Sequence, residues 1–165
     1  MDKNFIKLAS EFNDKFRELP EDKAAKGSMT VTVKREHNVI KQEAKSFYFG
    51  ATDSAFFLYA YLGDTSKNHQ YIQILGDEQL REKTYELAPE GTKGAYAWYN
   101  FVDGGTHMKI GSGKLVIWEV SIDPNDPFRG FVKGSIDFEC EDRHPTDSKL
   151  KVVSKDFWIE GKGSQ

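Results

Sequence analysis

Cysteine is almost missing from this chain of 165 residues, which contains Cys140 alone. A single thiol cannot form an intrachain disulfide, so the chain is not a small disulfide-bonded scaffold and suits a reducing compartment. Long apolar runs are missing as well. Nothing approaches the ~20 apolar residues of a membrane helix, and no apolar segment typical of a secretory signal follows Met1. We therefore predict a cytoplasmic chain without a transmembrane segment.

An excess of basic charge is also absent, because 23 Lys and Arg residues are balanced by 26 Asp and Glu residues and the net charge is −3. General binding to nucleic acid needs a basic surface and is therefore not expected. One segment differs, since residues 23–45 carry six basic side chains: Lys23, Lys26, Lys34, Arg35, Lys41 and Lys45. They form either a patch for an anionic partner or the solvated face of a strand.

The residue pairs that usually hold metals are missing too. The four histidines, His37, His69, His107 and His144, lack the close spacing of a zinc site, and no cysteine pair exists. Neither a metal site nor a cofactor is predicted. The oxygen-rich segment Asp123–Asp126 has ligands suited to calcium, but Asp, Asn and Pro are also the usual residues of turns.

No arrangement typical of catalysis stands out. Cys140 and His144 are close enough in sequence to suggest a nucleophile and its base. However, Cys140 alternates with Ile136 and Phe138 on one face of a predicted strand, which directs the thiol into the core. No catalytic residue is predicted, and the chain is expected to bind rather than to catalyse.

Aromatic residues, in contrast, are abundant: the chain has 12 Phe, 7 Tyr and 3 Trp. Such residues favour pleated, half-buried surfaces and indicate β structure. About nine strands are predicted from alternation and from the turn signals between segments. They fall within residues 28–35, 46–49, 55–62, 70–75, 84–87, 96–102, 114–120, 131–140, 150–153 and 157–159. The last of these, from residue 114 onward, form an antiparallel meander.

Residues 2–19 predict one amphipathic helix. Its apolar residues recur at steps of three and four and lie on one stripe: Phe5, Leu8, Phe12, Phe16 and Leu19. Pro20 disfavours helical geometry at the residue before it and ends the helix. The stripe either docks on the sheet of the same chain, which we expect, or serves a partner or a lipid surface.

These patterns define the expected fold class as mostly β: an antiparallel β-sandwich or open barrel with one N-terminal amphipathic α-helix. A length of 165 residues suits one domain. We expect residues 1–165 to form that single domain, with helix 2–19 docked on a β domain that spans residues 28–160.

The order of the C-terminal strands resembles a known pattern. The segments are KTYELAPEG from Lys83, AYAWYNF from Ala95, GKLVI from Gly113, GFVKGSIDF from Gly130 and FWIE from Phe157. Over residues 84–160 this order is similar to that of small bacterial β-sandwich domains of unknown function, many of them lipoproteins. The sequence departs from their pattern at Glu82 and Lys83, where a glycine is usual, and in its N-terminal helix. The resemblance implies a β-sandwich and no particular activity.

The aromatic strand at residues 96–102 offers a candidate binding surface. Tyr96 and Trp98 share one face of this strand and Tyr99 lies on the other, and exposed Tyr and Trp faces are what sugars and peptides stack on. We predict a non-catalytic binding module for a protein or glycan, with Tyr96, Trp98 and Tyr99 as ligand-binding residues. One alternative is a small-ligand-binding or hydrolytic β-barrel with an interior pocket. Another is a toxin or immunity-type protein.

Overall fold

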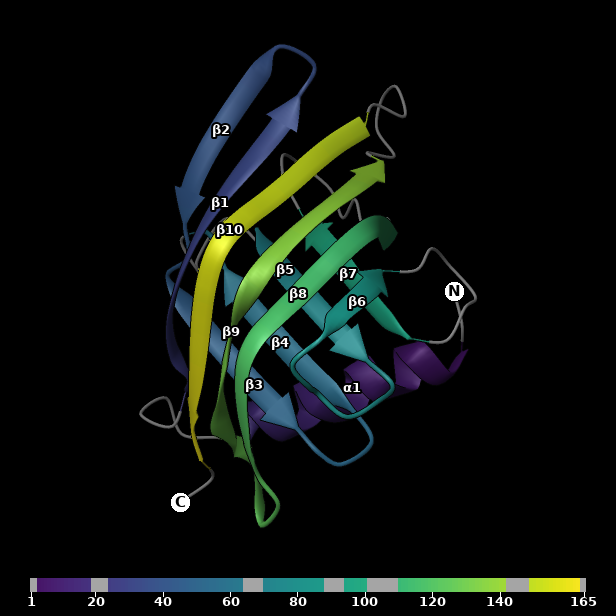
Figure 1. The fold of residues 1–165 in the computed structure, drawn as a ribbon, viewed down its shortest axis with the longest axis vertical. Coiled ribbons are helices and arrows are strands. Elements are labelled where there is room, and N and C mark those ends of the chain that lie inside the picture. Colours follow the sequence, from purple (N-terminus) through teal and green to yellow (C-terminus); the bar gives the residue numbers. More distant parts are fainter. Residues whose placement is uncertain are drawn as a thin grey trace.

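The computed structural model describes residues 3–18, 24–63, 70–87, 94–100, 110–141 and 149–163. These segments contain one helix and ten strands (Figure 1). In chain order they are α1 Lys3–Arg17, β1 Lys26–Arg35, β2 Asn38–Glu43, β3 Ser46–Ala51, β4 Phe56–Tyr61, β5 Tyr71–Gly76, β6 Thr84–Leu87, β7 Ala95–Asn100, β8 Ile110–Asp123, β9 Asp126–Glu141 and β10 Lys149–Lys162.

The described strands all belong to one sheet, in the order β2-β1-β10-β9-β8-β6-β7-β5-β4-β3. The pairings are antiparallel apart from a short parallel contact between β6 and β7. The sheet folds over on itself, because β3 at one end contacts β9, β10 and β1. The predicted fold class, a mostly β sandwich or open barrel with an N-terminal helix, is confirmed.

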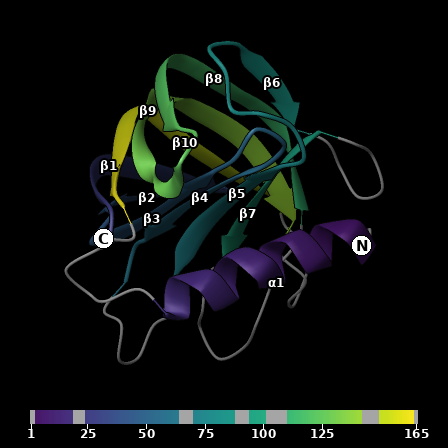
Figure 2. The ribbon, with the colours of Figure 1, turned by 90° about the horizontal axis from the view of Figure 1, so that it is seen from below.

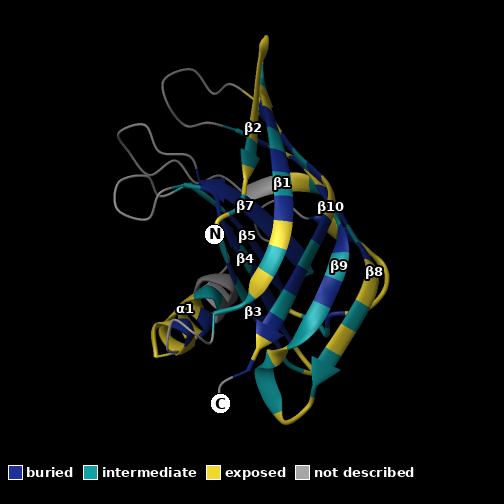
Figure 3. Ribbon diagram, turned by 90° about the vertical axis from the view of Figure 1, so that its left-hand side faces the viewer, coloured by how far each residue is buried: buried dark blue, intermediate teal, exposed yellow. Residues whose placement is uncertain are grey.

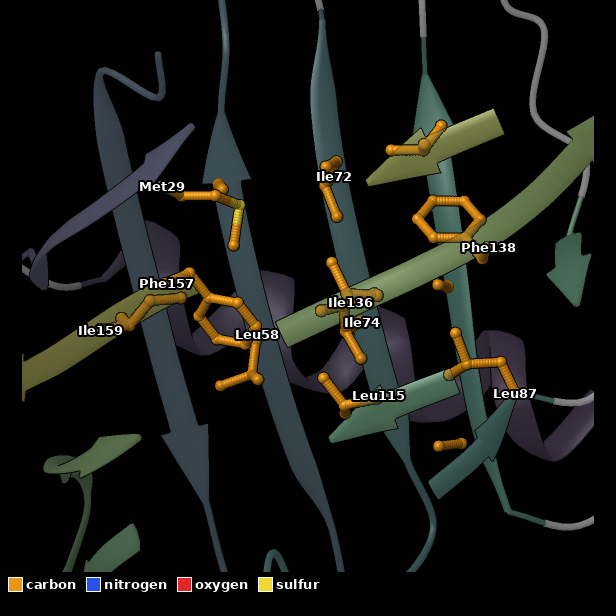
Figure 4. Packing of buried hydrophobic residues seen from close by; sticks show 14 of the residues in the cluster. Met29, Leu58, Ile72, Ile74, Leu87, Leu115, Ile136, Phe138, Phe157 and Ile159 are labelled. Atoms are coloured by element: carbon orange, nitrogen blue, oxygen red, sulfur yellow. The ribbon is translucent and has the colours of Figure 1, made fainter. Parts of the chain in front are cut away.

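Folding the sheet over produces two layers whose strands cross (Figure 1). We call β1, β2, β8, β9 and β10 the long-strand layer, and β3, β4, β5 and β7 the helix-covered layer. The core lies between them: Ile136 and Phe138 of β9 meet Leu58 of β4 and Ile74 of β5 in one cluster (Figure 4). Each such side chain contributes roughly 1.5–3 kcal/mol when buried, so the interior holds the two layers together.

One edge of the fold depends on a close approach between the layers. Phe49 of β3 reaches β9 and β10 where two glycines leave room for its ring. A Cβ atom would lie 2.7 Å from the Phe49 ring at Gly130 and 2.8 Å from it at Gly161. Glycine at these two positions therefore lets β3 pack against the middle of the long-strand layer.

Helix α1 lies across the outer face of the helix-covered layer (Figure 2). Phe12 and Phe16 are buried there, with ring centroids 5.5 Å and 5.0 Å from that of Phe57. The remaining residues of the predicted stripe, Leu19 and the side chains of Phe5 and Leu8, lie outside the described residues. No helix in the described segments has the length and hydropathy needed to cross a membrane.

Two strands differ from the prediction. The hairpin strand β2 was not expected, because its six residues are almost entirely exposed and carry no alternation (Figure 3). The separate segments predicted around residues 150–153 and 157–159 form the single strand β10, with a β-bulge between Ser154 and Phe157. A bulge adds a residue to one strand and interrupts the alternation, which explains the apparent break.

Candidate functional site

The three predicted ligand-binding residues do not form an exposed surface. Tyr96, Trp98 and Tyr99 are 2%, 3% and 4% exposed. β7 lies inside the sheet, and both of its faces are covered. Tyr99 belongs to the core between the layers, whereas Tyr96 and Trp98 pack in the cluster that contains Phe12 and Phe16 of α1. The expectation of exposure is corrected, although the separation of Tyr96 and Trp98 from Tyr99 is as predicted.

Strand register extends the row that contains Trp98 to a more accessible place. Trp98 pairs with Gln73, Gln73 with Tyr59, and Tyr59 with Tyr48, so these four side chains cross the outer face of the helix-covered layer in one line. Trp98 and Gln73 are buried, while Tyr48 and Tyr59 are half-buried. The accessible aromatic part of this row therefore lies on β4 and β3, two and three strands from the predicted site on β7.

A groove opens where this row meets the C-terminal part of α1. We call it the tyrosine groove; it is about 270 Å³ in volume and is lined by Asn13, Phe16, Arg17, Tyr48, Phe57, Tyr59, Tyr71 and Gln73. The helix supplies one wall, and β3, β4 and β5 supply the floor. The groove thus combines aromatic faces with two carboxamides and one guanidinium group.

The rings of the tyrosine groove are held by mutual contact. Phe57 and Tyr59 are two residues apart on β4 and lie nearly parallel, with centroids 5.9 Å apart and planes 8° apart. Tyr71 on β5 stacks on Tyr59 at 5.1 Å and 26°. Tyr48 meets Tyr59 edge to face at 5.6 Å, and Phe16 of α1 lies 5.1 Å from Tyr48. Rings packed in this way keep their orientation, and the half-buried Tyr48, Tyr59 and Tyr71 give the groove a preformed aromatic surface.

The electrostatics of the groove are simple. Burial raises the pKa of Tyr59 well above its ordinary value of 10.0, and Tyr71, Tyr61 and Tyr48 raise it further. Burial, with Tyr61, also raises the pKa of Tyr71. Both hydroxyls therefore stay protonated and neutral at physiological pH. Arg17 is the single charged side chain among the eight that line the groove, which makes the site weakly electropositive.

This arrangement suits binding better than catalysis. Among the described residues that line it there is no carboxylate, histidine, cysteine or serine, the groups that most often act as nucleophile or general base. Its stacking faces, amides and guanidinium group are instead the means by which a polar ring is recognised.

The sequence of β4 contains a signal for this site that differs from the predicted binding residues on β7. In Phe56–Tyr61 the even-numbered residues Phe56, Leu58 and Ala60 face the core, and the odd-numbered Phe57, Tyr59 and Tyr61 face outward. Tyrosine carries a polar hydroxyl at its tip. When tyrosines gather on one face of an otherwise apolar strand, that face is expected to be accessible to solvent or to a ligand. Their position beside α1 depends on long-range packing, which local pattern does not reveal.

The cysteine and the histidines considered in the sequence analysis lie away from the tyrosine groove or outside the described residues. Cys140 is buried at 4% exposure, as the alternation predicts. His69, His107 and His144 lie outside the described residues, and His37 is exposed in the turn between β1 and β2. Within the described segments, no group of three or more His, Cys, Asp and Glu side chains is placed to hold a metal ion.

The oxygen-rich segment forms the tight turn between β8 and β9. The backbone N–H of Asn125 donates to Oδ1 of Asp123 at 2.8 Å, and that of Phe128 donates to Oδ1 of Asp126 at 3.1 Å. Two carboxylates therefore accept backbone hydrogen bonds in the manner of an Asx turn, which is the turn interpretation of this segment.

The exposure of Trp118 was not predicted from the sequence. Trp118 is 47% exposed and sits at a β-bulge of β8, where the register shifts between Ile117 and Glu119. On the neighbouring strands Phe131 and Trp158 stack at 6.3 Å. A tryptophan within a strand is normally expected to be buried, and the bulge that exposes Trp118 has no local sequence signal.

Comparison with protein families, with curated proteins and with solved structures finds no match to this chain.

Proposed function

We propose that this chain is a non-catalytic binding module that holds one sugar ring of a glycan in the tyrosine groove. The observation that carries the proposal is the groove itself: the half-buried rings of Tyr48, Tyr59 and Tyr71 lie beside the amide of Gln73 and the guanidinium of Arg17. Aromatic faces pack against apolar faces, and the polar groups fix orientation and specificity.

Size and charge favour a sugar over a peptide. A groove of about 270 Å³ is slightly smaller than the usual range for ligand sites, which is roughly 300–1,000 Å³, and it suits one ring of a longer chain. Amides and tyrosine hydroxyls can both donate to and accept from sugar hydroxyls. Arg17 adds a donor that prefers a carboxylate, so a uronic acid or another acidic sugar fits best.

The interior is less suited to a ligand than the groove. The inward side chains of both layers form one apolar cluster of buried residues. Within the described segments, its polar members are few and include the hydroxyls of Tyr85 and Tyr99 and the thiol of Cys140. A binding site normally presents several converging polar groups, and the tyrosine groove has more of them.

Calorimetric titration with acidic and neutral oligosaccharides tests the proposal. We expect saturable binding of an acidic oligosaccharide and a loss of about tenfold or more in affinity for Arg17→Gln, because a hydrogen bond to a charged group is removed. Lys15→Gln is the matched control, since Lys15 is exposed on the same helix but lines no part of the groove. Failure of every oligosaccharide to bind, or equal losses in the two variants, would contradict the proposal.

The exposed Trp118, with the neighbouring stacked pair Phe131 and Trp158, is a second candidate surface. Exposed tryptophan is a frequent anchor in recognition. If Trp118→Ala abolishes oligosaccharide binding while Arg17→Gln has no effect, the binding surface lies on the long-strand layer instead.

A further inference from the structure

A second groove lies on the outer face of the long-strand layer, away from α1. It is about 630 Å³ in volume and is lined by Thr30, Thr32, Lys34, Lys41, Asp137, Lys151, Val153, Lys155 and Asp156. We call it the lysine groove. Its four lysines come from β1, β2 and β10, so residues about 110 positions apart in sequence are brought together by strand pairing.

Strand register fixes the arrangement of these charges. Thr32 pairs with Val153 at the centre of the floor, and Lys41 and Asp137 extend the same row on either side. Lys34 pairs with Lys151 in the next row outward. Two lysines directly opposite each other on one face repel one another, and Glu139, which pairs with Lys151 from β9, offsets only part of this repulsion.

The lysines of the groove make no close ion pair among the described residues. The ion pairs among the described residues involve other lysines, for example Lys26 with Glu160 and Lys114 with Glu86. None of the described ion pairs involves Lys34, Lys41, Lys151 or Lys155. Asp137 and Asp156 leave the groove with an excess of two positive charges, although the net charge of the chain is −3.

A backbone irregularity shapes the same place. The pairing of β1 with β10 is interrupted between Thr32/Val153 and Met29/Phe157, and β10 has one more residue than β1 in the gap. The bulge exposes both Lys155 and Asp156 to solvent. Bulges are frequent beside binding sites, where they redirect a side chain.

From these observations we propose that the lysine groove binds a compact anion that carries several phosphate groups, such as a short polyphosphate chain. Such a ligand places charge between Lys34 and Lys151 and reaches Lys41 and Lys155, while Thr30 and Thr32 supply hydroxyl donors. The segment 23–45 thus contributes Lys34 and Lys41 to an anion site, and the other half of that site comes from β10. The proposal is independent of the tyrosine groove.

Titration of the full chain with tripolyphosphate, followed by calorimetry and by amide chemical shifts, tests this inference. At low ionic strength we expect one saturable site that weakens as salt is added, because the lysines are exposed and are screened. The largest shifts should fall on Thr32, Val153 and Lys155. Lys34→Gln combined with Lys151→Gln should weaken binding by about tenfold or more, since charge-assisted hydrogen bonds are lost.

The control is Lys45→Gln combined with Lys162→Gln, which removes the same charge from exposed lysines outside the groove. Compared at physiological ionic strength, this variant should bind within about twofold of the wild type, because distant exposed charges are screened there. Asp137→Asn should tighten binding, since it removes a repulsive carboxylate from the site. Absence of binding, or equal loss in the two double variants, would overturn the proposal. Neither result would bear on sugar binding, which Arg17→Gln tests separately.

Discussion

Tyr59 is surrounded by aromatic rings on the outer face of β4, and this environment governs its ionisation. It stacks between Phe57 and Tyr71, and Tyr48 meets its edge. Burial, followed by the charges of Tyr71, Tyr61 and Tyr48, raises its pKa. In the core, burial raises the pKa of Tyr99 to about 12. Both residues therefore make the free energy of unfolding depend on pH in the alkaline range.

We predict that the free energy of unfolding falls as the pH rises above about 10, where an unfolded tyrosine loses its proton. In that range folded Tyr59 still holds its proton, so the unfolded state binds fewer protons and is favoured by raising the pH. Below about pH 10 the contribution is fully present. Tyr59→Phe should therefore lose less stability than the wild type between pH 8 and 11, as measured by urea denaturation. Equal losses would show that Tyr59 ionises normally in the folded chain.

The two tryptophans in β7 and β8 should respond oppositely to truncation. Trp98 is 3% exposed, and its replacement by Ala should cost about 3–5 kcal/mol, as for other buried aromatic residues. Trp118 is 47% exposed, and Trp118→Ala should change stability by no more than about 1 kcal/mol. Thermal or chemical denaturation of the two variants distinguishes these cases. A fully stable Trp98→Ala protein would restore Trp98 as a candidate surface residue.

At this scale the sequence predicts which residues alternate but not which face remains accessible. The inward placement of Val132, Ile136, Phe138 and Cys140 follows from period-two alternation and is confirmed. The burial of Trp98 and the exposure of Trp118 depend on a helix docking from elsewhere in the chain and on a bulge. Neither the docking of the helix nor the bulge can be predicted from the few residues on either side of each tryptophan.

At the scale of elements, α1 contributes both stability and one wall of the tyrosine groove. Phe12 and Phe16 cover Phe57, and with Leu75 and Tyr96 they form the cluster beneath the helix. A chain that lacks residues 1–20 would expose this face of the helix-covered layer. We expect it to aggregate or to melt at a much lower temperature, because a contiguous apolar patch is exposed.

Light scattering and thermal melting of the truncated chain test this expectation. Lys7→Gln in the full chain is a suitable control, since Lys7 is exposed and pairs only weakly with Glu11 at 4.0 Å. A truncated chain that stays monomeric with an unchanged melting temperature would show that α1 does not stabilise the sheet.

Elements with strong periodicity were predictable, and those without it were not. The helix predicted at residues 2–19 is observed at Lys3–Arg17 because its phenylalanines recur at helical spacing. β2 was missed because Val39 and Ile40 are 61% and 51% exposed, so burial gives it no pattern. That strand forms through backbone pairing with β1, from Thr30↔Glu43 to Arg35↔Asn38.

At the scale of the whole molecule, the mostly β character follows from composition, but the strand order does not. β1 pairs with β10 at opposite ends of the chain, and β3 reaches the middle of the other layer. Such pairings join residues that are far apart in the sequence. Local sequence patterns do not show which distant strands will meet, because this depends on the entropy of closing long loops and on the contacts formed afterwards. The lysine groove depends on the same pairings, which is why only its half in residues 23–45 could be suspected from the sequence.

Closure of the sheet at Phe49 gives a test at this scale. A Cβ atom at Gly161 would lie 2.1 Å from the carbonyl oxygen of Phe128 and 2.8 Å from the Phe49 ring, so Gly161→Ala forces β3 and β10 apart. Overpacking of this kind costs about 1–3 kcal/mol. Phe49→Leu removes part of the ring and also costs stability, because Phe49 is buried at 2% exposure.

The combination of these two substitutions is the informative measurement. Leucine at position 49 relieves the contact of the new methyl group with the ring but not its clash with the Phe128 carbonyl, so the double variant should recover part of the sum of the two single losses. Residues in direct contact show such coupling by about 0.5–3 kcal/mol, whereas distant residues show additive effects. Urea denaturation of the wild type, the two single variants and the double variant gives this coupling energy. Strict additivity would mean that β3 does not lie against Gly161, and that the sheet is more open than a folded-over barrel.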